Sequence, residues 1–314
     1  MDPLATLSLI WACYAFVFGA CIGSFLNVVI LRLPRGETLG GRSHCRCGAL
    51  IKWHDNIPIL GWIFLRGRAR CCGAPFSVRY PAVELITGLL FLGLWQQYEP
   101  TTAAAYALFA SLMVVAAGVD LDTMEIPDTT SIGGFILGVW ISMFLPTLQG
   151  VDGDLFVFAA FQSGLQALIN GLVCSALILW IGILSSALLK KETMGFGDVK
   201  LMGAIGAFCG WQGGLFSIFG GATLGLICLA LWQGLRLVLP KRAVQEPFVV
   251  PVSAEEGYRE AFELAAKHPD EWELEANSPI PFGPMLAGGA LVYLILLREP
   301  VDAFFAELQA LILG

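Results

Sequence analysis

One aspartate stands between two long apolar stretches, within the sequence Met194-Gly195-Phe196-Gly197-Asp198. Residues 172–189 before it are almost free of charge, and residues 201–239 after it are apolar nearly throughout. Asp198 is therefore expected at or just inside a bilayer surface, where an ionisable side chain marks a functional site by default. The flanking glycines would let a substrate backbone approach closely, so Gly195, Phe196 and Gly197 are candidate substrate-binding residues.

A second acidic cluster ends another apolar stretch, with Asp120 directly after it. Two aspartates close together in a low-dielectric site tend to share one proton. One carboxylate can then take a proton from a water that attacks a peptide carbonyl, while its protonated partner donates to the carbonyl oxygen and later to the leaving amine. Asp120 and Asp198 are therefore the predicted catalytic residues, and no Ser-His-acid arrangement competes because the three histidines lie in soluble loops.

The remaining acids of that cluster are Asp122, Glu125 and Asp128. For Asp122 and Asp128 the simplest interpretation is a solvated carboxylate at a helix end. Pro127 disfavours helix in the residue before it, so we expect a break before the next apolar stretch. The alternative is a local acidic surface beside Asp120 that attracts a basic substrate segment.

The composition indicates an all-α polytopic membrane protein. The 314 residues are 57% hydrophobic and 14% charged, with a mean hydropathy of +0.74. Hydropathy predicts about eight transmembrane helices, the first a retained span and not a cleaved signal. The predicted spans are residues 7–31, 82–96, 103–119, 132–145, 165–189, two within 201–239 divided by a turn at 210–214, and 285–297.

The basic residues set the predicted orientation. Nine of the eighteen Lys and Arg fall within residues 32–80, so the positive-inside rule places this loop in the cytoplasm. Asp120 and Asp198 then arrive at the same cytoplasmic depth, and the net charge of −7 gives no reason to expect a nucleic-acid partner. The predicted parts are a first helix (1–32), a basic cysteine-containing cytoplasmic domain (33–81), a transmembrane core (82–242), an acidic cytoplasmic insertion (243–279), and a last helix with a tail that lies on the outer membrane surface (280–314).

Four of the nine cysteines, Cys45, Cys47, Cys71 and Cys72, crowd into this loop. Clustered thiols in a reducing compartment favour metal over disulfide, and zinc takes four Cys or His ligands from two short turns. The spacings are tighter than the usual Cys-x2-Cys, and pairing His44 with Cys47 would leave Cys72 without such a partner. A zinc site and a metal-free loop both remain open.

The chain resembles the bacterial type IV prepilin peptidases, intramembrane aspartic peptidases of the Gly-x-Gly-Asp type. The resemblance covers nearly the whole chain and rests on six motifs in order. They are Gly-Ser-Phe-Leu-Asn-Val-Val-Ile-Leu-Arg-Leu-Pro at 23–34, Asn56-Ile57-Pro58, Arg79-Tyr80-Pro81 with Glu84, Ile126-Pro127-Asp128, Gly195-Phe196-Gly197-Asp198-Val199-Lys200-Leu201 and Ile280-Pro281-Phe282-Gly283-Pro284.

The resemblance implies an eight-helix protein of the bacterial inner membrane that removes the leader of prepilins and type II secretion pseudopilins on the cytoplasmic face. It implies Asp120 and Asp198 as the catalytic pair. It also implies methylation of the new amino terminus with S-adenosylmethionine, for which Asn27 and Glu84 are candidates because they border the cytoplasmic face. The family usually carries two Cys-x2-Cys pairs, from which this loop departs.

Other functions remain open at this stage. A peptidase without methyltransferase activity would account for the altered cysteine spacing. An ion or proton transporter could use the same carboxylates, although no internal repeat is visible. A structural scaffold of a secretion or pilus machine would tolerate loss of both aspartates. The oligomeric state and the position of the methyl-donor pocket are not predicted.

Overall fold

The computed structural model describes residues 3–45, 47–153, 155–190, 194–238 and 281–313. The chain divides into two compact units, one made of Met1–Leu224 with Phe282–Gly314 and the other of Gly225–Pro281. The sites discussed below belong to the first unit, and only the helix that begins at Phe196 continues into the second, as far as Val238. The predicted acidic insertion at 243–279 lies outside the described residues.

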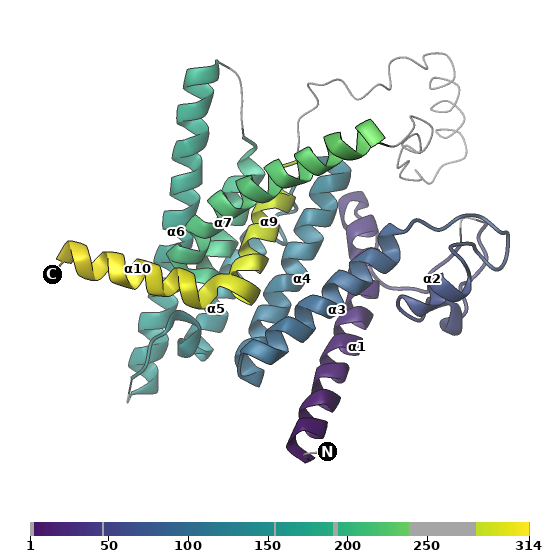
Figure 1. Ribbon diagram of the computed structural model, residues 1–314, viewed down its shortest axis with the longest axis horizontal. Helices are drawn as coiled ribbons and strands as arrows, with labels where there is room; N and C mark the ends of the chain where they lie inside the picture. The colour runs from purple at the N-terminus through teal and green to yellow at the C-terminus, as the bar shows by residue number, and fades with distance from the viewer. Residues whose placement is uncertain (1–2, 46, 154, 191–193, 239–280, 314) are drawn as a thin grey trace. The chain divides into compact units, whose positions relative to one another are not determined.

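The described residues form helices joined by turns, without a β-strand, which confirms the all-α class (Figure 1). The α-helices are α1 (Pro3–Arg32), α2 (Leu60–Phe64), α3 (Arg79–Gln97), α4 (Pro100–Thr123), α5 (Ile132–Phe144), α6 (Phe156–Leu189), α7 (Phe196–Val238), α9 (Gly283–Val292) and α10 (Arg298–Leu313). Short 3-10 helices lie at Leu33–Arg35, Trp53–Asn56 and Pro146–Gln149, and a π-helix at Tyr293–Leu297 joins α9 to α10.

Four helical segments in the described part of the chain are long and apolar enough to cross a membrane, so the protein is a multi-pass membrane protein. They are Thr6–Arg35, Pro100–Thr123, Phe156–Leu189 and Phe196–Leu231. α5 has 13 residues, a length of about 20 Å against about 30 Å of hydrocarbon, so it is shorter than a full span. Helices occur at all the predicted positions, but they do not establish the eight complete transmembrane spans that the sequence predicts.

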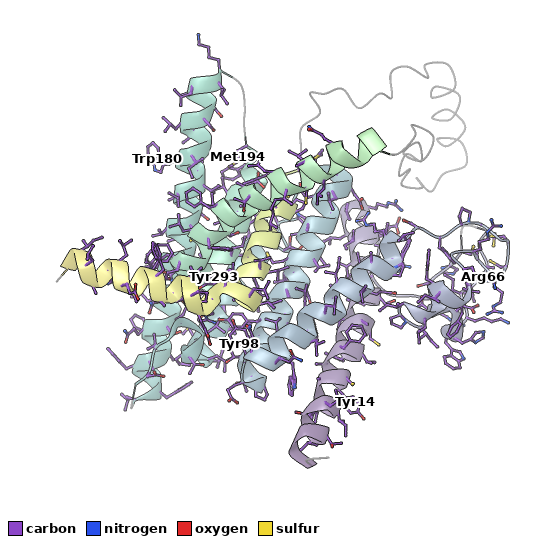
Figure 2. The ribbon with its side chains drawn as sticks, in the orientation of Figure 1. Tyr14, Arg66, Tyr98, Trp180, Met194 and Tyr293 are labelled. Carbon is purple, nitrogen blue, oxygen red and sulfur yellow. The ribbon has the colours of Figure 1, made fainter. Side chains whose placement is uncertain are left out.

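α6 shows the membrane character most directly. Most of its large apolar side chains are exposed, with Trp180 68% exposed and Leu184 63% exposed. Trp180 projects away from the neighbouring helices (Figure 2). A continuous apolar surface of this size is expected where a helix faces lipid.

Of two predicted breaks in the chain, the one after α4 is confirmed and the one at 210–214 is only a kink. α4 ends at Thr123, where Met124 adopts a left-handed conformation (φ 57°) and its amide donates to the Asp120 carbonyl oxygen at 2.9 Å. The predicted turn at 210–214 is reduced to a kink at one residue, because α7 continues through Gly210, whose φ of 71° and ψ of 176° are not helical.

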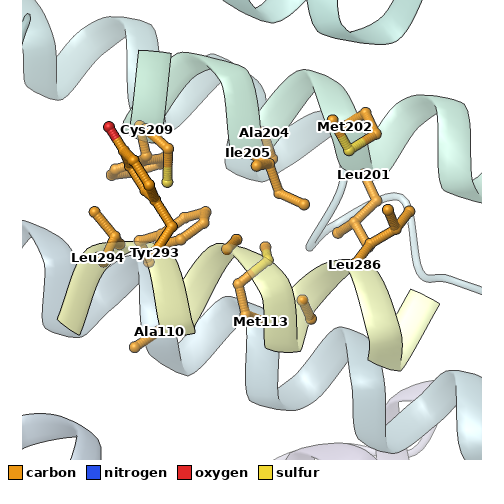
Figure 3. Close-up of a cluster of buried hydrophobic side chains, with 14 of the residues drawn as sticks. Ala110, Met113, Leu201, Met202, Ala204, Ile205, Cys209, Leu286, Tyr293 and Leu294 are labelled. Atoms are coloured by element: carbon orange, nitrogen blue, oxygen red, sulfur yellow. The ribbon is translucent and has the colours of Figure 1, made fainter. Parts of the chain in front are cut away.

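The main hydrophobic core lies between α4, α7 and α9 (Figure 3). The core includes Met113 of α4, Leu201, Met202 and Ile205 of α7 and Leu286 of α9, and all five side chains are fully buried. These helices carry the predicted catalytic aspartates at their ends. Close packing of their apolar faces therefore fixes where the two carboxylates lie.

A second, smaller cluster joins α1 to α4 through Leu26, Ile30, Val115 and Val119. α1 also packs along α3, and the two helices approach closely at Gly23. A Cβ atom at Gly23 would lie 2.8 Å from the Glu84 Cα atom, so only glycine fits there. This packing brings Asn27 and Glu84 to the same helix pair.

The opposite end of α4 is closed by a polar cluster. The Arg298 guanidinium lies 5.4 Å from the Tyr106 ring centroid and 5.6 Å from that of Tyr98, and the Tyr293 hydroxyl donates to Asp302 at 2.6 Å (Figure 2). Tyr106 precedes Asp120 by 14 residues, about 21 Å along a helix. The cluster therefore stabilises the bundle far from the aspartates.

Candidate active site

Asp120 and Asp198 come from two helices that meet at one end of the core. Asp120 lies in the last turn of α4 and Asp198 in the first turn of α7. Asp120 is only 5% exposed and Asp198 only 7% exposed. The two carboxylates lie close enough for the charge of one to act on the other. We call these two side chains the carboxylate pair.

Asp120 is anchored by the third core helix. Its Oδ2 atom accepts a hydrogen bond of 3.1 Å from the backbone amide of Gly283, the first residue of α9. An amide at a helix N-terminus is a favourable partner for a carboxylate, which offsets the unfavourable position of Asp120 at the C-terminus of α4. A Cβ atom at Gly283 would lie 2.6 Å from this oxygen, so a larger residue would displace it.

The loop after α4 ties the two aspartate-bearing helices together. Ile126 packs between Gly197 and Gly283, with side-chain atoms 3.3 Å and 2.9 Å from where their Cβ atoms would lie. The Lys200 ammonium of α7 forms an ion pair of 2.7 Å with Asp128 of this loop. The acidic cluster and the Gly-x-Gly-Asp stretch, far apart in sequence, therefore form one structural unit.

The acids predicted to contact substrate differ in their surroundings. Asp122 is only 8% exposed at its side chain and is paired with Arg79, so it is not the solvated carboxylate expected from its position at a helix end. Asp128 is 64% exposed and paired with Lys200. Glu125 is exposed, and its carboxylate has no partner among the residues that the structure describes.

The stretch before Asp198 leaves room beside the carboxylate pair. Phe196 is 65% exposed, with the Lys200 ammonium 5.5 Å from its ring centroid. A Cβ atom at Gly195 would have its nearest neighbour, the Asp198 Oδ2 atom, at 3.9 Å. Gly195 and Phe196 are therefore placed where a polypeptide could reach the pair, whereas Gly197 is covered by Ile126.

The four loop cysteines converge in spite of their tight spacing. The Sγ atoms of Cys45 and Cys72 lie 3.4 Å apart and those of Cys47 and Cys71 lie 3.3 Å apart, with all four within 4.8 Å of one another. We call them the cysteine cluster. His44 is not needed to complete it.

The geometry of the cysteine cluster fits a tetrahedral zinc ion. Zinc–sulfur bonds of about 2.3 Å place the sulfurs about 3.8 Å apart, close to the spacing found. A hydrogen bond with the Cys47 backbone lowers the pKa of the Cys45 thiol to about 7, whereas hydrogen bonding with Cys47 Sγ raises the pKa of the Cys71 thiol to about 12. A bound metal would hold the coordinating sulfurs as thiolates.

Asn27 and Glu84 lie together at the ends of α1 and α3. Glu84 is 8% exposed, and its Oε2 atom accepts a hydrogen bond of 2.7 Å from the Ile59 amide. Asn27 is 6% exposed and donates to the Tyr80 carbonyl oxygen at 3.1 Å. Both side chains therefore hold the basic loop (residues 33–81) or the start of α3 in place.

Several residues that build the site had no role in the sequence interpretation. Gly283 was noticed only within a motif, and nothing in the sequence indicates that its amide meets Asp120. Arg79 pairs with Asp122 and donates to the Gly118 carbonyl oxygen at 2.8 Å. Such pairings join residues 39 to 163 positions apart, which spacing alone cannot predict.

Comparison with known proteins adds independent evidence. Residues 17–98 match the bacterial peptidase A24 N-terminal domain, and residues 107–230 match the type IV leader peptidase family. No solved structure matches the chain.

Curated relatives match over most of their length. A protein of Myxococcus xanthus is 33% identical over 91% of this chain and 90% of its own. Proteins of Klebsiella pneumoniae (37% identical, covering 65% of this chain and 87% of the relative) and Dickeya chrysanthemi (35%, 74% and 88%) are also similar. All three are named prepilin leader peptidase/N-methyltransferase. With its two matched domains and a relative aligned over 91% of its length, the chain belongs to the type IV leader peptidase family.

Proposed function

We propose that this protein removes the leader peptide of type IV prepilins and then methylates the new amino terminus. The observation that carries the peptidase activity is the carboxylate pair, two buried aspartates brought to one end of the core by α4 and α7. The methyltransferase activity rests on the relatives, all of which carry it in their names. Neither a transporter nor a peptidase lacking methyltransferase activity is favoured by this family membership.

Cleavage follows from two carboxylates that share one proton. The ionised aspartate takes a proton from a water, whose oxygen attacks the carbonyl carbon of the scissile bond. The protonated aspartate donates its proton to the carbonyl oxygen. As the carbon–nitrogen bond breaks, the aspartate that accepted the water proton gives a proton to the leaving amine, and the other aspartate takes back a hydroxyl proton as the carbonyl re-forms. Gly283 holds one Asp120 oxygen fixed, so that the water and the carbonyl meet the pair in a constant geometry.

Substrate binding is proposed along Gly195 and Phe196, with the backbone of the substrate passing beside Asp198. Prepilins and type II secretion pseudopilins carry a basic leader, which the acids after α4 would attract. Because Asp122 and Asp128 already have cationic partners, Glu125 is the acid best placed to contribute an uncompensated charge. Gly197 would act indirectly, by admitting Ile126.

Methyl transfer is proposed at the basic loop. S-adenosylmethionine supplies a methyl group on a positively charged sulfur. Asn27 and Glu84 are the proposed methyltransferase residues, and the cysteine cluster would hold zinc that keeps the loop folded over them. The loop and both aspartates would face the cytoplasm from the bacterial inner membrane.

Mass spectrometry of a prepilin incubated with the purified protein and S-adenosylmethionine tests this function. The wild type should remove the leader and add about 14 Da, the mass of a methylene group. Asp120→Asn and Asp198→Asn should each lower cleavage by about a thousandfold or more, since each removes one member of a unit. Asp302→Asn, at the opposite end of the bundle, is the matched control. Cleavage by either active-site variant at the control rate would exclude the paired-aspartate mechanism.

A further inference from the structure

A cavity of about 550 Å³ lies between the cytoplasmic ends of α1 and α3 and the basic loop. α1 contributes Ser24, Asn27 and Val28 to its lining, and α3 contributes Tyr80 and Glu84. The carboxylate pair is not among its lining residues. The cavity is therefore separate from the proposed peptidase site, and its volume is in the range of small-molecule sites.

The floor of the cavity carries a buried carboxylate. Glu84 receives a hydrogen bond from the Ile59 amide at 2.7 Å and one from the Ser24 side chain. No cation lies within ion-pair distance of Glu84 among the residues the structure describes. A buried carboxylate with neutral partners only is suited to a cationic ligand, which would compensate its charge.

The hydrogen bond to Glu84 depends on a strained backbone. Ile59 has φ 62° and ψ −53°, and the Leu60 amide donates to the Pro58 carbonyl oxygen at 2.6 Å, so Ile59 is the central residue of a γ-turn. A β-branched residue is rarely found with positive φ, and such strain persists where the surrounding structure requires it. Here the turn aims the Ile59 amide at Glu84 on the cavity floor.

The walls of the cavity suit an aromatic ring and a polar tail. Trp62, Leu65 and Phe76 form an apolar wall, and the Trp62 indole nitrogen donates to the Phe76 carbonyl oxygen at 3.2 Å, which fixes its ring. Arg32, Arg35 and Lys52 add cationic groups to the lining, which also contains Glu37 and the ion pair between Arg70 and Asp55. Cys45 and Cys71 of the cysteine cluster also line it, so a metal there would set the shape of the wall.

We infer that this cavity binds S-adenosylmethionine together with the amino terminus of the cleaved pilin, with their cationic groups beside Glu84. The inference rests on the proposed methyltransferase function and gives it a site. Adenine would stack on the wall around Trp62 and Phe76, and the carboxylate of the methionine part would meet the cationic lining. A negatively charged lipid headgroup fits less well, because it would lie against the buried carboxylate.

Glu84 and the groups that contact it then have defined roles in methyl transfer. The amine nitrogen of the pilin forms a bond to the methyl carbon, and the sulfur retains the electron pair of the bond that breaks. The nitrogen must lose one proton for this attack, and Glu84 is placed to accept it. Ser24 and the Ile59 amide position the Glu84 carboxylate and do not touch the reacting atoms.

Two variants test the assignment, each with a matched control. Glu84→Gln removes the charge and keeps the shape, and Glu99→Gln is the same change at an exposed position beside α4. Val28→Phe fills the cavity, and Val17→Phe makes the same change on a 58% exposed face of α1. Binding is measured by equilibrium dialysis of labelled S-adenosylmethionine against the full-length purified protein. Glu84→Gln and Val28→Phe should weaken binding about tenfold or more, and the two controls should bind within about twofold of wild type.

Ultraviolet cross-linking of the labelled donor to the wild type, followed by peptide mapping, locates the site without relying on activity. Labelled peptides should contain residues 24–28 or 57–76. Cleavage of a prepilin by each variant shows that the fold is retained.

The outcomes separate the site from the function. Weakened binding in both cavity variants, with label on those peptides, supports the assignment. The assignment of the cavity is wrong if both cavity variants bind the donor normally or if the label maps to other peptides. The proposed function still stands in that case, provided that the wild type methylates prepilin. A wild type that cleaves but neither binds the donor nor methylates overturns both.

Discussion

The carboxylate pair and the cysteine cluster are held in place by different means. Asp120 and Asp198 lie at the end of a close-packed core of α4, α7 and α9, where apolar helix faces set their positions. The cysteine cluster lies in a loop with little regular structure, where three of the four thiols are exposed. The loop is held by the sulfurs themselves, by a bidentate contact between Arg70 and Asp55 and by the hydrogen bond from Ile59 to Glu84.

This difference predicts that the two proposed activities fail separately. A change in the core should displace a carboxylate without reaching the loop. Loss of a metal from the loop should loosen the cavity without moving α4 or α7. One polar contact that joins the two regions is the ion pair between Arg79, which begins α3, and Asp122 of α4. The predictions below test the separation, from the largest expected effect to the smallest.

Gly283→Ala should have the largest effect, and on cleavage alone. The added Cβ atom would lie 2.6 Å from the Asp120 Oδ2 atom, so the carboxylate has to move. Because displacement by about 1 Å can cost about a hundredfold in rate, we expect a loss of that order in prepilin cleavage. Methylation of a synthetic pilin peptide that lacks the leader should remain within about twofold of wild type, because α9 does not reach the cavity.

Gly288→Ala is the matched control for this change. It lies on the same helix, and its added Cβ atom would have its nearest neighbour at 3.5 Å, an ordinary van der Waals contact. Equal cleavage by the two variants would show that the contact between Gly283 and Asp120 does not position the pair.

Removal of metal should produce the opposite result. The purified protein should contain about one zinc ion per chain, and Cys47→Ser or a chelator should lower methylation by about tenfold to a hundredfold. Cleavage should stay within about threefold of wild type. Elemental analysis and both activity assays check this, with Cys13→Ser, an exposed cysteine of α1, as the control. Full methylation by a zinc-free protein would show that the cysteines serve another purpose.

Arg79→Lys tests the contact between the two regions. Lysine keeps the charge but cannot bond Asp122 and the Gly118 carbonyl oxygen at once, as the Arg79 guanidinium does. Because the pair is largely buried, we expect a loss of about 1–2 kcal/mol in the free energy of unfolding. Thermal unfolding should detect it, and both activities should fall by a similar factor. A fall in only one activity would place Arg79 within a single site.

The sequence predicts the class of the fold, and it singles out the two aspartates that α4 and α7 bring to one end of the core, because both depend on local patterns. Apolar stretches predicted most helices to within about four residues, and Pro127 marked the break after α4. They missed the first nine residues of α6, and they predicted two spans where α7 is one kinked helix. The sequence does not predict the anchoring of Asp120 by Gly283, the pairing of Asp122 with Arg79 or the γ-turn at Ile59, because these features arise from contacts between distant segments. The cysteines show the same limit. Their spacing departs from the usual pattern, yet the folded loop brings all four sulfurs together.

Glu125→Lys should have the smallest effect, and it depends on salt. Glu125 is exposed and lies five residues beyond Asp120, while the neighbouring Asp122 and Asp128 are neutralised by Arg79 and Lys200. An exposed charge attracts a basic leader over about 10 Å at 0.1 M salt, so reversal should raise KM about twofold to fivefold at low salt and less at high salt. The kcat should not change, because Glu125 does not contact the carboxylate pair. Glu99→Lys, at the other end of α4, provides the control. If KM is unchanged at low salt, the leader is not guided by this acid, and recognition must lie in the contacts along Gly195 and Phe196.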